Sequence, residues 1–155
     1  MVVPKGHTSN IKMAIYNPQL PIVATASNDK TVKLWDIASG KLINTFSGHV
    51  GGVNHIKFSP NGRILAAASD TLIYLWNVMN GQLMAKYSTT YKPVSNFFFS
   101  SASDRFIYQK TKNSFSIHNL NTGHLISRHT VPGVQITSGI FNASTNELFT
   151  VVDQT

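Results

Sequence analysis

The sequence predicts an all-β chain made of repeated four-stranded antiparallel units, and three observations support this prediction. Gly6-His7 is followed by Trp35-Asp36 at nearly the same distance at which Gly48-His49 is followed by Trp76-Asn77. Short apolar runs alternate with glycine and proline turns, which is the pattern of strands joined by tight turns. Charged residues make up only 12% of the 155 residues, against roughly 25% in an average domain, and this low charge favours a strand-rich chain.

The first strand of each unit is found by aligning the copies on the Gly-His pair. Residues 11–18 then lie opposite residues 53–60, and both segments are apolar runs that enter a proline turn. A shift of 41 residues brings 94–100 into the same register, and a further shift of 42 brings in 136–142. The sequence therefore predicts four first strands.

The second, third and fourth strands follow in the same order. The second strands are apolar on both faces, as expected for a strand that is covered on two sides. Glycine turns at 36–40, 77–81 and 119–123 separate the third strands from the fourth. The predicted second strands are 22–26, 64–68, 106–108 and 148–152, the third are 31–35, 72–76 and 115–118, and the fourth are 41–46, 82–87 and 124–130.

Repeats of this length that open with Gly-His and close with Trp-Asp resemble the WD40 family, whose units form the blades of a β-propeller. The resemblance implies one WD40-repeat region over residues 1–155, with blades at about 6–46, 48–87, 89–130 and 131–155, the last incomplete. It rests on motif residues over 6–81 and on spacing over 89–153. The expected fold is a partial β-propeller of about three and a half WD40 blades.

Three and a half blades cannot close a ring, since propellers usually have about four to eight blades. We therefore expect the protein to continue beyond Thr155, or another chain to supply the missing strands. Two copies of this chain would not complete one another. The unfinished blade lacks its third and fourth strands, whereas a second copy would offer first and second strands.

The resemblance also implies a side-chain hydrogen-bond network inside each blade. A half-buried imidazole and an indole N–H both need partners, and a carboxylate that accepts from both would satisfy them. In the first blade the matching residues are His7, Thr25, Asp29 and Trp35, and in the second they are His49, Asp70 and Trp76.

The network is expected to weaken along the chain. In the second blade the hydroxyl position falls on Ala66 or Ala67, so the network there is incomplete. In the third blade Thr90 stands in place of the histidine and His118 in place of the tryptophan. We expect that blade to depend on packing instead, with a core formed by Phe97, Phe99, Phe106, Ile107, Phe115 and Ile117.

The sequence argues against catalysis. His7, Asp29 and a hydroxyl are the ingredients of a hydrolytic triad, but the same residue types recur at the repeat period, as a structural network requires and a catalytic site does not. Nucleophile-elbow, phosphate-loop and His-Glu-x-x-His motifs are absent from the sequence. We expect no enzyme activity, cofactor, metal site or small-molecule substrate. A propeller enzyme, the remaining alternative, would need polar residues along the central channel, and the strands that would line it offer Met13, Ile15, Ile56, Phe98 and Gly139 or their neighbours.

Charge and composition indicate the cellular location and an alternative partner of the chain. Thirteen basic and six acidic residues give a net charge of +7, spread evenly along the sequence, and there is no cysteine. No run approaches the roughly 18 apolar residues that a membrane span needs, so we expect a cytoplasmic or nuclear protein without membrane contact. The charge leaves RNA as an alternative partner, with candidate phosphate contacts at Lys12, Lys57, Lys92, Arg105 and Lys110.

The leading functional hypothesis is a scaffold or adaptor module that binds other proteins within a larger complex. Propellers of this family present the loops between blades and the turns between second and third strands to their ligands, because loops carry recognition while the strands hold them in place. An exposed tyrosine beside a lysine has the properties of an interface anchor. The candidate partner-binding residues are Asn10, Asn28, Ser69, Tyr91 and Lys92.

Overall fold

The computed structural model describes residues 6–142, 144–145 and 147–153, and within them it contains strands and turns and no helix. Residues 1–5 and 154–155, which fall inside the predicted repeat region, lie outside the described part. The strands are β1 (Ile11–Tyr16), β2 (Ile22–Ser27), β3 (Val32–Asp36), β4 (Leu42–Phe46), β5 (Val53–Phe58), β6 (Ile64–Ser69), β7 (Leu72–Asn77), β8 (Leu83–Ser88), β9 (Phe97–Phe99), β10 (Arg105–Thr111), β11 (Ser114–Asn119), β12 (Leu125–Thr130), β13 (Gln135–Asn142) and β14 (Glu147–Asp153).

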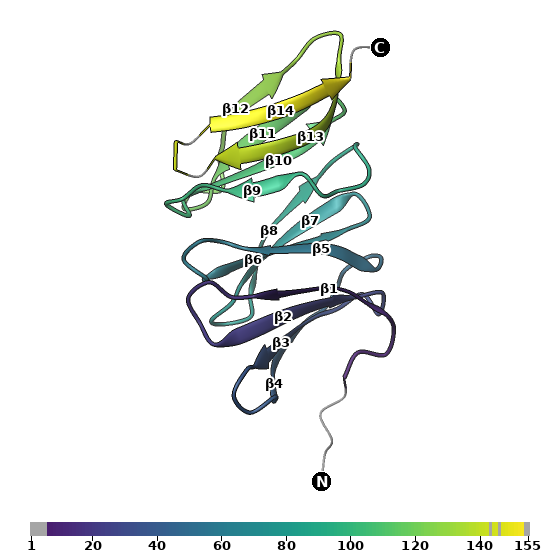
Figure 1. The fold of residues 1–155 in the computed structure, drawn as a ribbon, viewed down its shortest axis with the longest axis vertical. Coiled ribbons are helices and arrows are strands. Elements are labelled where there is room, and N and C mark those ends of the chain that lie inside the picture. Colours follow the sequence, from purple (N-terminus) through teal and green to yellow (C-terminus); the bar gives the residue numbers. More distant parts are fainter. Residues whose placement is uncertain (1–5, 143, 146, 154–155) are drawn as a thin grey trace.

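The strands form three four-stranded sheets and one two-stranded sheet, each pairing its strands antiparallel in sequence order. We call these sheets blade 1 (β1–β4), blade 2 (β5–β8), blade 3 (β9–β12) and blade 4 (β13–β14). Figure 1 shows the four blades stacked one on another, with the first strands β1, β5, β9 and β13 following each other along one side. The predicted all-β class with four-stranded antiparallel units is confirmed.

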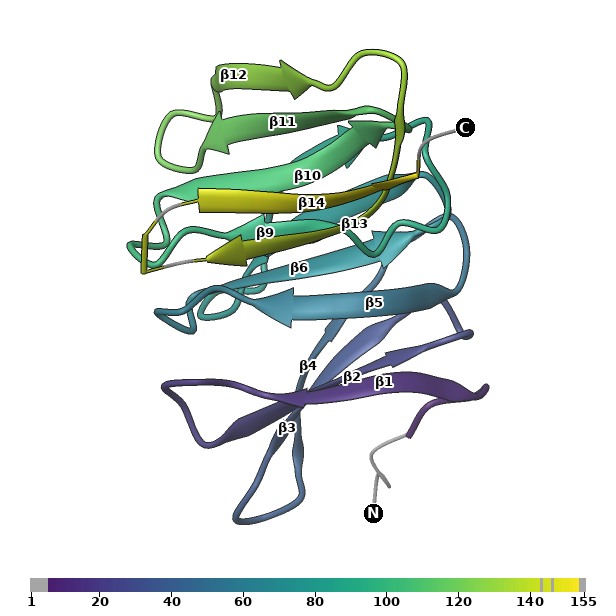
Figure 2. The same cartoon turned by 45° about the horizontal axis from the view of Figure 1, so that its top comes forward.

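The register follows the repeat. In blade 1, Ala24 lies between Ile15 on β1 and Leu34 on β3, and in blade 2 the equivalent Ala66 lies between Lys57 and Leu75. The outer strands β4, β8 and β12 each pair only with the third strand of their own blade. Figure 2 shows the same blades turned forward; among the first strands, β1 is lowest, β5 lies above it, and β9 and β13 lie above β5.

Strand β9 is shorter than predicted, because residues 93–95 form local turns instead of pairing with β10. The N–H of Ser95 donates to the carbonyl of Pro93 at 3.1 Å, and the N–H of Phe97 donates to the carbonyl of Ser95 at 3.2 Å. These local turns use N–H groups that a strand would give to its neighbour, and Pro93 has no N–H to give. The segment therefore forms the loop that leads into β9, and Pro93 and Val94 face residues of blade 2 across a pocket.

The core consists of three apolar layers, one between each pair of neighbouring blades. The layer between blades 1 and 2 centres on Phe46, Leu34 and Trp76, and the layer between blades 2 and 3 on Phe97 and Phe106. The layer between blades 3 and 4 has only three buried members, Ile107, Phe115 and Ile136. Strand β6 is buried along its whole length, as its continuous apolar sequence predicts. Of the predicted third-blade core, Ile117 is the one residue that is only partly buried.

Polar contacts at the turns tie blade 1 to blade 2. The side-chain amide of Asn17 donates to the carbonyl of Gly62 at 2.8 Å, and its Oδ1 accepts from the N–H of Gln19 at 2.9 Å. Gly62 has φ +70, and a Cβ there would lie 2.4 Å from Asn17 Oδ1. Since both the backbone conformation and the space require glycine, this turn fixes how the two blades stack.

Candidate functional site

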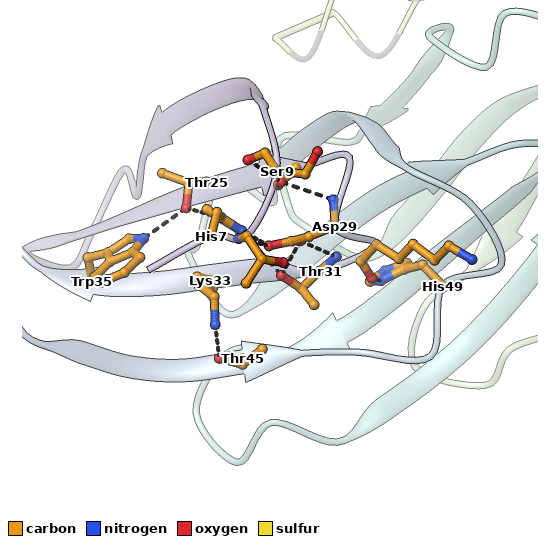
Figure 3. A network of polar contacts seen from close by, with 12 residues as sticks. His7, Ser9, Thr25, Asp29, Thr31, Lys33, Trp35, Thr45 and His49 are labelled. Atoms are coloured by element: carbon orange, nitrogen blue, oxygen red, sulfur yellow. Dashed lines mark hydrogen bonds and ion pairs between the residues drawn. The ribbon is translucent and has the colours of Figure 1, made fainter. Parts of the chain in front are cut away.

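A continuous chain of hydrogen bonds crosses blade 1 from the outer end of β3 to the loop before β1 (Figure 3). Trp35 Nε1 donates to Thr25 Oγ1 at 2.8 Å, and Thr25 Oγ1 lies 2.7 Å from His7 Nε2. His7 Nδ1 lies 2.8 Å from Asp29 Oδ2. The structure thus brings together all four residues that the resemblance assigned to this blade.

The order of donors along this chain is set by its ends. The indole of Trp35 can only donate, so Thr25 Oγ1 accepts from it. The hydroxyl of Thr25 in turn donates a hydrogen bond to His7 Nε2. His7 is then a donor at Nδ1 and reaches the carboxylate of Asp29, which can only accept when ionised. Every member is satisfied with a single tautomer of the imidazole, and the chain locks the loop before β1 onto the sheet.

Asp29 collects more partners than the sequence indicated. Its carboxylate accepts from Thr31 Oγ1 at 2.6 Å, from the N–H of Thr31 at 3.0 Å and from the N–H of Thr8 at 3.0 Å. Burial alone would raise the pKa of Asp29, but the hydrogen bonds from Thr31, His7 and Thr8 outweigh it and hold the pKa well below its ordinary value. The side chain of Asp29 is 7% exposed and that of His7 is 2% exposed.

One detail of the expected chemistry is wrong. The indole N–H of Trp35 does not donate to the carboxylate of Asp29, because Thr25 lies between them and accepts instead. Thr31 was not singled out in the sequence. A hydroxyl two residues after the turn aspartate is the signal that could have found it, since Ser and Thr often bond to a turn carboxylate of this kind.

Blade 2 keeps the histidine and the tryptophan but holds them differently. His49 Nδ1 lies 3.0 Å from the carbonyl of Lys30, which belongs to blade 1, and Trp76 Nε1 donates to His49 Nε2 at 3.4 Å. Ala66 and Ala67 supply no hydroxyl to stand between the two rings. The histidine therefore bridges two blades instead of closing a network within one.

His49 is enclosed by aromatic rings. Its ring centroid lies 4.5 Å from that of Tyr74 and 5.8 Å from that of Trp76. Burial lowers the pKa of His49, and the charge of Lys86 lowers it further, while the bond to the carbonyl of Lys30 opposes the shift. The imidazole is therefore held neutral, with Nδ1 as its donor.

Asp70 departs from its expected role. It contacts Lys92 instead of His49, and it lies in the left-handed region with φ 55. The turn that carries Asp70 is one residue shorter than the turn that carries Asp29, so the carboxylate is not placed where Asp29 stands. It pairs instead with the lysine of the loop that leads into blade 3.

Blade 3 was expected to depend on packing, but it also contains a buried polar network. Gln109 on β10 is 3% exposed, and its Oε1 accepts from the side-chain amide of Asn96 at 2.7 Å. Its own amide nitrogen donates to the carbonyl of Ile136 in blade 4 at 3.1 Å. Thr89 Oγ1 donates to the carbonyl of Gln109 at 2.8 Å. A glutamine inside an apolar strand was the signal for this buried network.

The residues that replace the motif in blade 3 lie near its edge. Thr90 is exposed, and its N–H donates to the carbonyl of Lys110 at 2.9 Å. His118 packs against Tyr87 with 4.5 Å between ring centroids. Neither reaches the other, so the His-to-Trp connection of blade 1 has no counterpart here.

The five candidate partner-binding residues differ in how far they are available. Asn10 and Asn28 are exposed, and the carbonyl of Asn10 accepts from the N–H of Asn28 at 3.0 Å. Ser69 is 0% exposed, because its hydroxyl accepts from the N–H of Gly51 at 3.0 Å and donates to the carbonyl of Gly51 at 2.8 Å. Ser69 therefore shapes the loop and does not face a partner. Tyr91 is half-buried and Lys92 is exposed.

A pocket of about 520 Å³ opens on this loop face between blades 2 and 3. The Lys92–Asp70 pair stands at its rim, and both side chains are more than half exposed. Burial lowers the pKa of His55 in this pocket, and the charge of Lys57 lowers it further. Its lining combines amide, imidazole and charged groups with apolar ones: Asn54, His55, Ala68, Asp70, Lys92, Pro93 and Val94.

The lining of the pocket offers both polar and apolar groups for contact with a ligand. It holds one carboxylate, which is committed to an ammonium group, and a histidine whose neutral form is favoured. Across the described residues, no three His, Cys, Asp or Glu side chains gather as metal ligands would. The described chain also has no helix long and apolar enough to cross a membrane.

Repeated antiparallel four-stranded blades, with first strands side by side and a His–Thr–Trp network inside the first blade, define the repeat class of a β-propeller. The family pattern described as WD domain, G-beta repeat matches residues 2–36 and 40–77. WD40 repeats therefore form the first half of the chain, and the fold is a partial WD40 propeller.

Several curated relatives share the repeat. Over 68 residues the chain is 35% identical to the small ribosomal subunit protein RACK1 of Neurospora crassa, covering 43% of this chain and 22% of that protein. It is 39% identical over 64 residues to WD repeat-containing protein 37 of Homo sapiens, covering 41% of this chain and 13% of that protein. It is 38% identical over 52 residues to transcription initiation factor TFIID subunit 5 of Caenorhabditis elegans, covering 34% and 8%. The chain thus spans about a fifth or less of the length of these relatives.

Proposed function

We propose that this chain is a protein-interaction module, acting as a scaffold or adaptor within a larger complex, and that it has no enzyme activity of its own. The observation that carries the proposal is the pocket between blades 2 and 3, with a charged pair at its rim and Tyr91 beside it. Two ordered blades hold the loops that form it, so a partner would meet a surface that is largely preformed. Such a surface lowers the entropy lost on binding.

The relatives support the same proposal. Two of them are named as parts of assemblies, a ribosomal subunit protein and a subunit of a transcription initiation factor. A cytoplasmic or nuclear location belongs to this proposal, and imaging of the tagged protein in cells tests it. The ranges 6–46, 48–87, 89–130 and 131–155 stand as the proposed blade boundaries.

We further propose that other strands complete blade 4, either from the same protein or from another chain. An apolar cavity of about 320 Å³ lies between blades 3 and 4 and is lined by Ile107, Phe115, Ile117, Phe141 and Leu148 among others. Blade 4 has two strands where the other blades have four. Light scattering on residues 1–155 alone tests this, because a stable, soluble monomer would count against the need for further strands.

The loop face is tested by reversing charge at its rim. Lys92→Glu places a second carboxylate next to that of Asp70. We expect the variant to lose binding partners that the unaltered protein captures. Arg63→Glu is the matched control, because Arg63 is exposed on the opposite end of blade 2. Quantitative mass spectrometry of the captured proteins should show losses with Lys92→Glu and not with Arg63→Glu. Equal profiles for the two variants would contradict the loop face as the binding surface.

RNA association is a second candidate function, supported by the net charge of +7. The structure weakens it, since Lys92 is paired with Asp70, Lys110 donates to Ser88, and Lys57 donates to the carbonyl of Phe97. Lys12 is exposed and Arg105 is half-buried. A filter-binding assay should show no RNA affinity that falls steeply with salt. A steep fall would favour RNA over protein as the partner.

A further inference from the structure

Lys57 occupies a position that the other blades fill with apolar side chains. It lies opposite Ala66 in blade 2, as Ile15 lies opposite Ala24 in blade 1 and Phe98 lies opposite Ile107 in blade 3. Ile15 and Phe98 both pack into apolar layers between blades. A lysine at such a position loses hydration, which costs free energy unless something compensates.

The hydration that the ammonium group of Lys57 loses is only partly replaced by contacts with the protein. Its Nζ donates to the carbonyl of Phe97 at 3.0 Å and stands 4.6 Å from the centre of the Phe98 ring. An ammonium group has three donors, and the described residues give this one a single hydrogen-bond acceptor. The described ion pairs are His7–Asp29 and Lys92–Asp70, so no described carboxylate lies within 4.0 Å of Lys57 Nζ. Burial lowers the pKa of Lys57.

A shallow cavity of about 200 Å³ lies beside this ammonium group, at the end of the first strands away from the loop face. It is lined by Lys57, Phe58, Pro60, Phe98, Phe99 and Phe141. The Phe98 and Phe141 ring centroids are 6.4 Å apart, so the wall runs from blade 2 across blade 3 to blade 4. A cavity of roughly 150 Å³ holds a benzene ring, and this one is therefore large enough for one side chain.

We propose that Lys57 and this cavity, which we call the Lys57 pocket, bind a carboxylate side chain of a partner polypeptide that carries an apolar residue next to it. The carboxylate takes the two free donors of the ammonium group, and the apolar neighbour packs on Phe98 and Phe141. A hydrogen bond between two charged groups is stronger than one between neutral groups, and the partly buried ammonium group gains an acceptor that the described residues do not supply. The pocket deepens the proposed role of the chain as an interaction module, and it lies apart from the loop face.

The same ammonium group could attract a phosphate, but the pocket does not favour one. Sequence-independent binding to nucleic acid depends on several cations that neutralise successive phosphates. Lys57 is the sole cation that lines this pocket, and its other lining residues are phenylalanine and proline. A single cation with apolar walls fits a carboxylate attached to an apolar group better than a strongly hydrated phosphate chain.

The test uses the intact protein and a capped tripeptide, acetyl-Leu-Glu-Leu-amide, with its Gln counterpart as the uncharged probe. The lysine ¹³Cε signals are followed by NMR during the titration. For a ligand this small we expect a dissociation constant on the order of 1 mM, with the Glu peptide bound at least about tenfold more tightly than the Gln peptide. The Lys57 signal should shift and the signal of exposed Lys12 should not. Equal binding of the two peptides, or no binding of either, overturns the proposal.

Variants and a second probe separate this site from its alternatives. Lys57→Met should weaken the Glu peptide at least about tenfold, while Lys57→Arg keeps the charge and should retain binding. Should Lys57→Met not fold, the Glu and Gln comparison on the unaltered protein still decides. Lys92→Glu should leave peptide binding unchanged, so failure of the loop face and failure of this pocket are distinguishable. Tighter binding of oligouridylate than of the peptide, lost in Lys57→Met, would assign the pocket to nucleic acid and overturn the proposal.

Discussion

Blades 1 and 2 share the Gly-His and Trp signature, yet they hold the histidine in different ways. In blade 1, His7 is satisfied inside its own blade by Thr25 and Asp29. In blade 2, His49 reaches the carbonyl of Lys30 in the neighbouring blade and accepts directly from Trp76. The same motif thus stabilises a loop in one blade and a contact between blades in the other.

Two small sequence differences produce this divergence. Alanine stands in blade 2 where Thr25 stands in blade 1, and the turn that carries Asp70 is one residue shorter than the turn that carries Asp29. Without the hydroxyl, the histidine moves into the apolar layer beside Tyr74. Without the longer turn, the carboxylate is free to pair with Lys92 on the loop face. Asp70 therefore takes no part in a network inside blade 2 and is instead a charged group of the proposed binding surface.

The largest expected effect is at the centre of the blade 1 network. Thr25→Val keeps the shape of the side chain but removes the hydroxyl, which leaves the indole of Trp35 and Nε2 of His7 without partners. An unsatisfied buried polar group costs roughly 1–3 kcal/mol, so we expect a loss of about 2–4 kcal/mol in the free energy of unfolding. Denaturant unfolding measures it. A loss below about 1 kcal/mol would show that water replaces the hydroxyl.

Removing the indole donor in each blade compares the two networks directly. Trp35→Phe should cost roughly 1–3 kcal/mol, because Thr25 Oγ1 loses the 2.8 Å hydrogen bond that it accepts from the indole N–H. Trp76→Phe removes a bond of 3.4 Å, near the outer limit of a hydrogen bond. We therefore expect Trp76→Phe to cost less, once the difference in side-chain volume common to both is subtracted. If the two variants unfold at the same denaturant concentration, the two histidines are held equally well and the contrast fails.

The two blades should also differ in how they respond to acid. The pKa of His49 is lowered by burial, so the unfolded chain binds a proton more readily and stability falls as the pH drops below about 6.5. The pKa of Asp29 is lowered by its hydrogen bonds, so its contribution is present above about pH 4 and is lost below that. The measurement is the free energy of unfolding as a function of pH. His49→Gln should reduce its pH dependence near about pH 6.5, and Asp29→Asn should reduce it below about pH 4. If His49→Gln instead changed only the part below about pH 4, and Asp29→Asn only the part near about pH 6.5, the two residues would have been assigned to the wrong parts of the pH dependence.

The sequence predicted the all-β class and the four-stranded units because apolar runs and turn residues recur at the repeat period. It pointed to His7, Thr25, Asp29 and Trp35, whose identities carry their chemistry. It could not predict the partner of His49, since that partner is a backbone carbonyl from another blade and every residue has one. It also missed the direction of Asp70, which depends on the backbone conformation of a short turn, and the network around Gln109, which replaces the motif with other residue types.

The smallest expected effect is in blade 3, where the tryptophan position holds His118. His118 packs against Tyr87 and stacks on Tyr108, with 4.5 and 5.8 Å between ring centroids, and its Nδ1 makes only a 3.4 Å contact with the carbonyl of Gly123. His118→Phe keeps an aromatic ring against both tyrosines and removes that weak contact, so we expect a change within about 0.5 kcal/mol. His118→Ala removes the stacking as well and should cost about 1 kcal/mol more. If His118→Phe proved as damaging as Trp35→Phe, the imidazole of His118 would have a polar role comparable to that of the blade 1 network, and the networks would not weaken from blade 1 to blade 3.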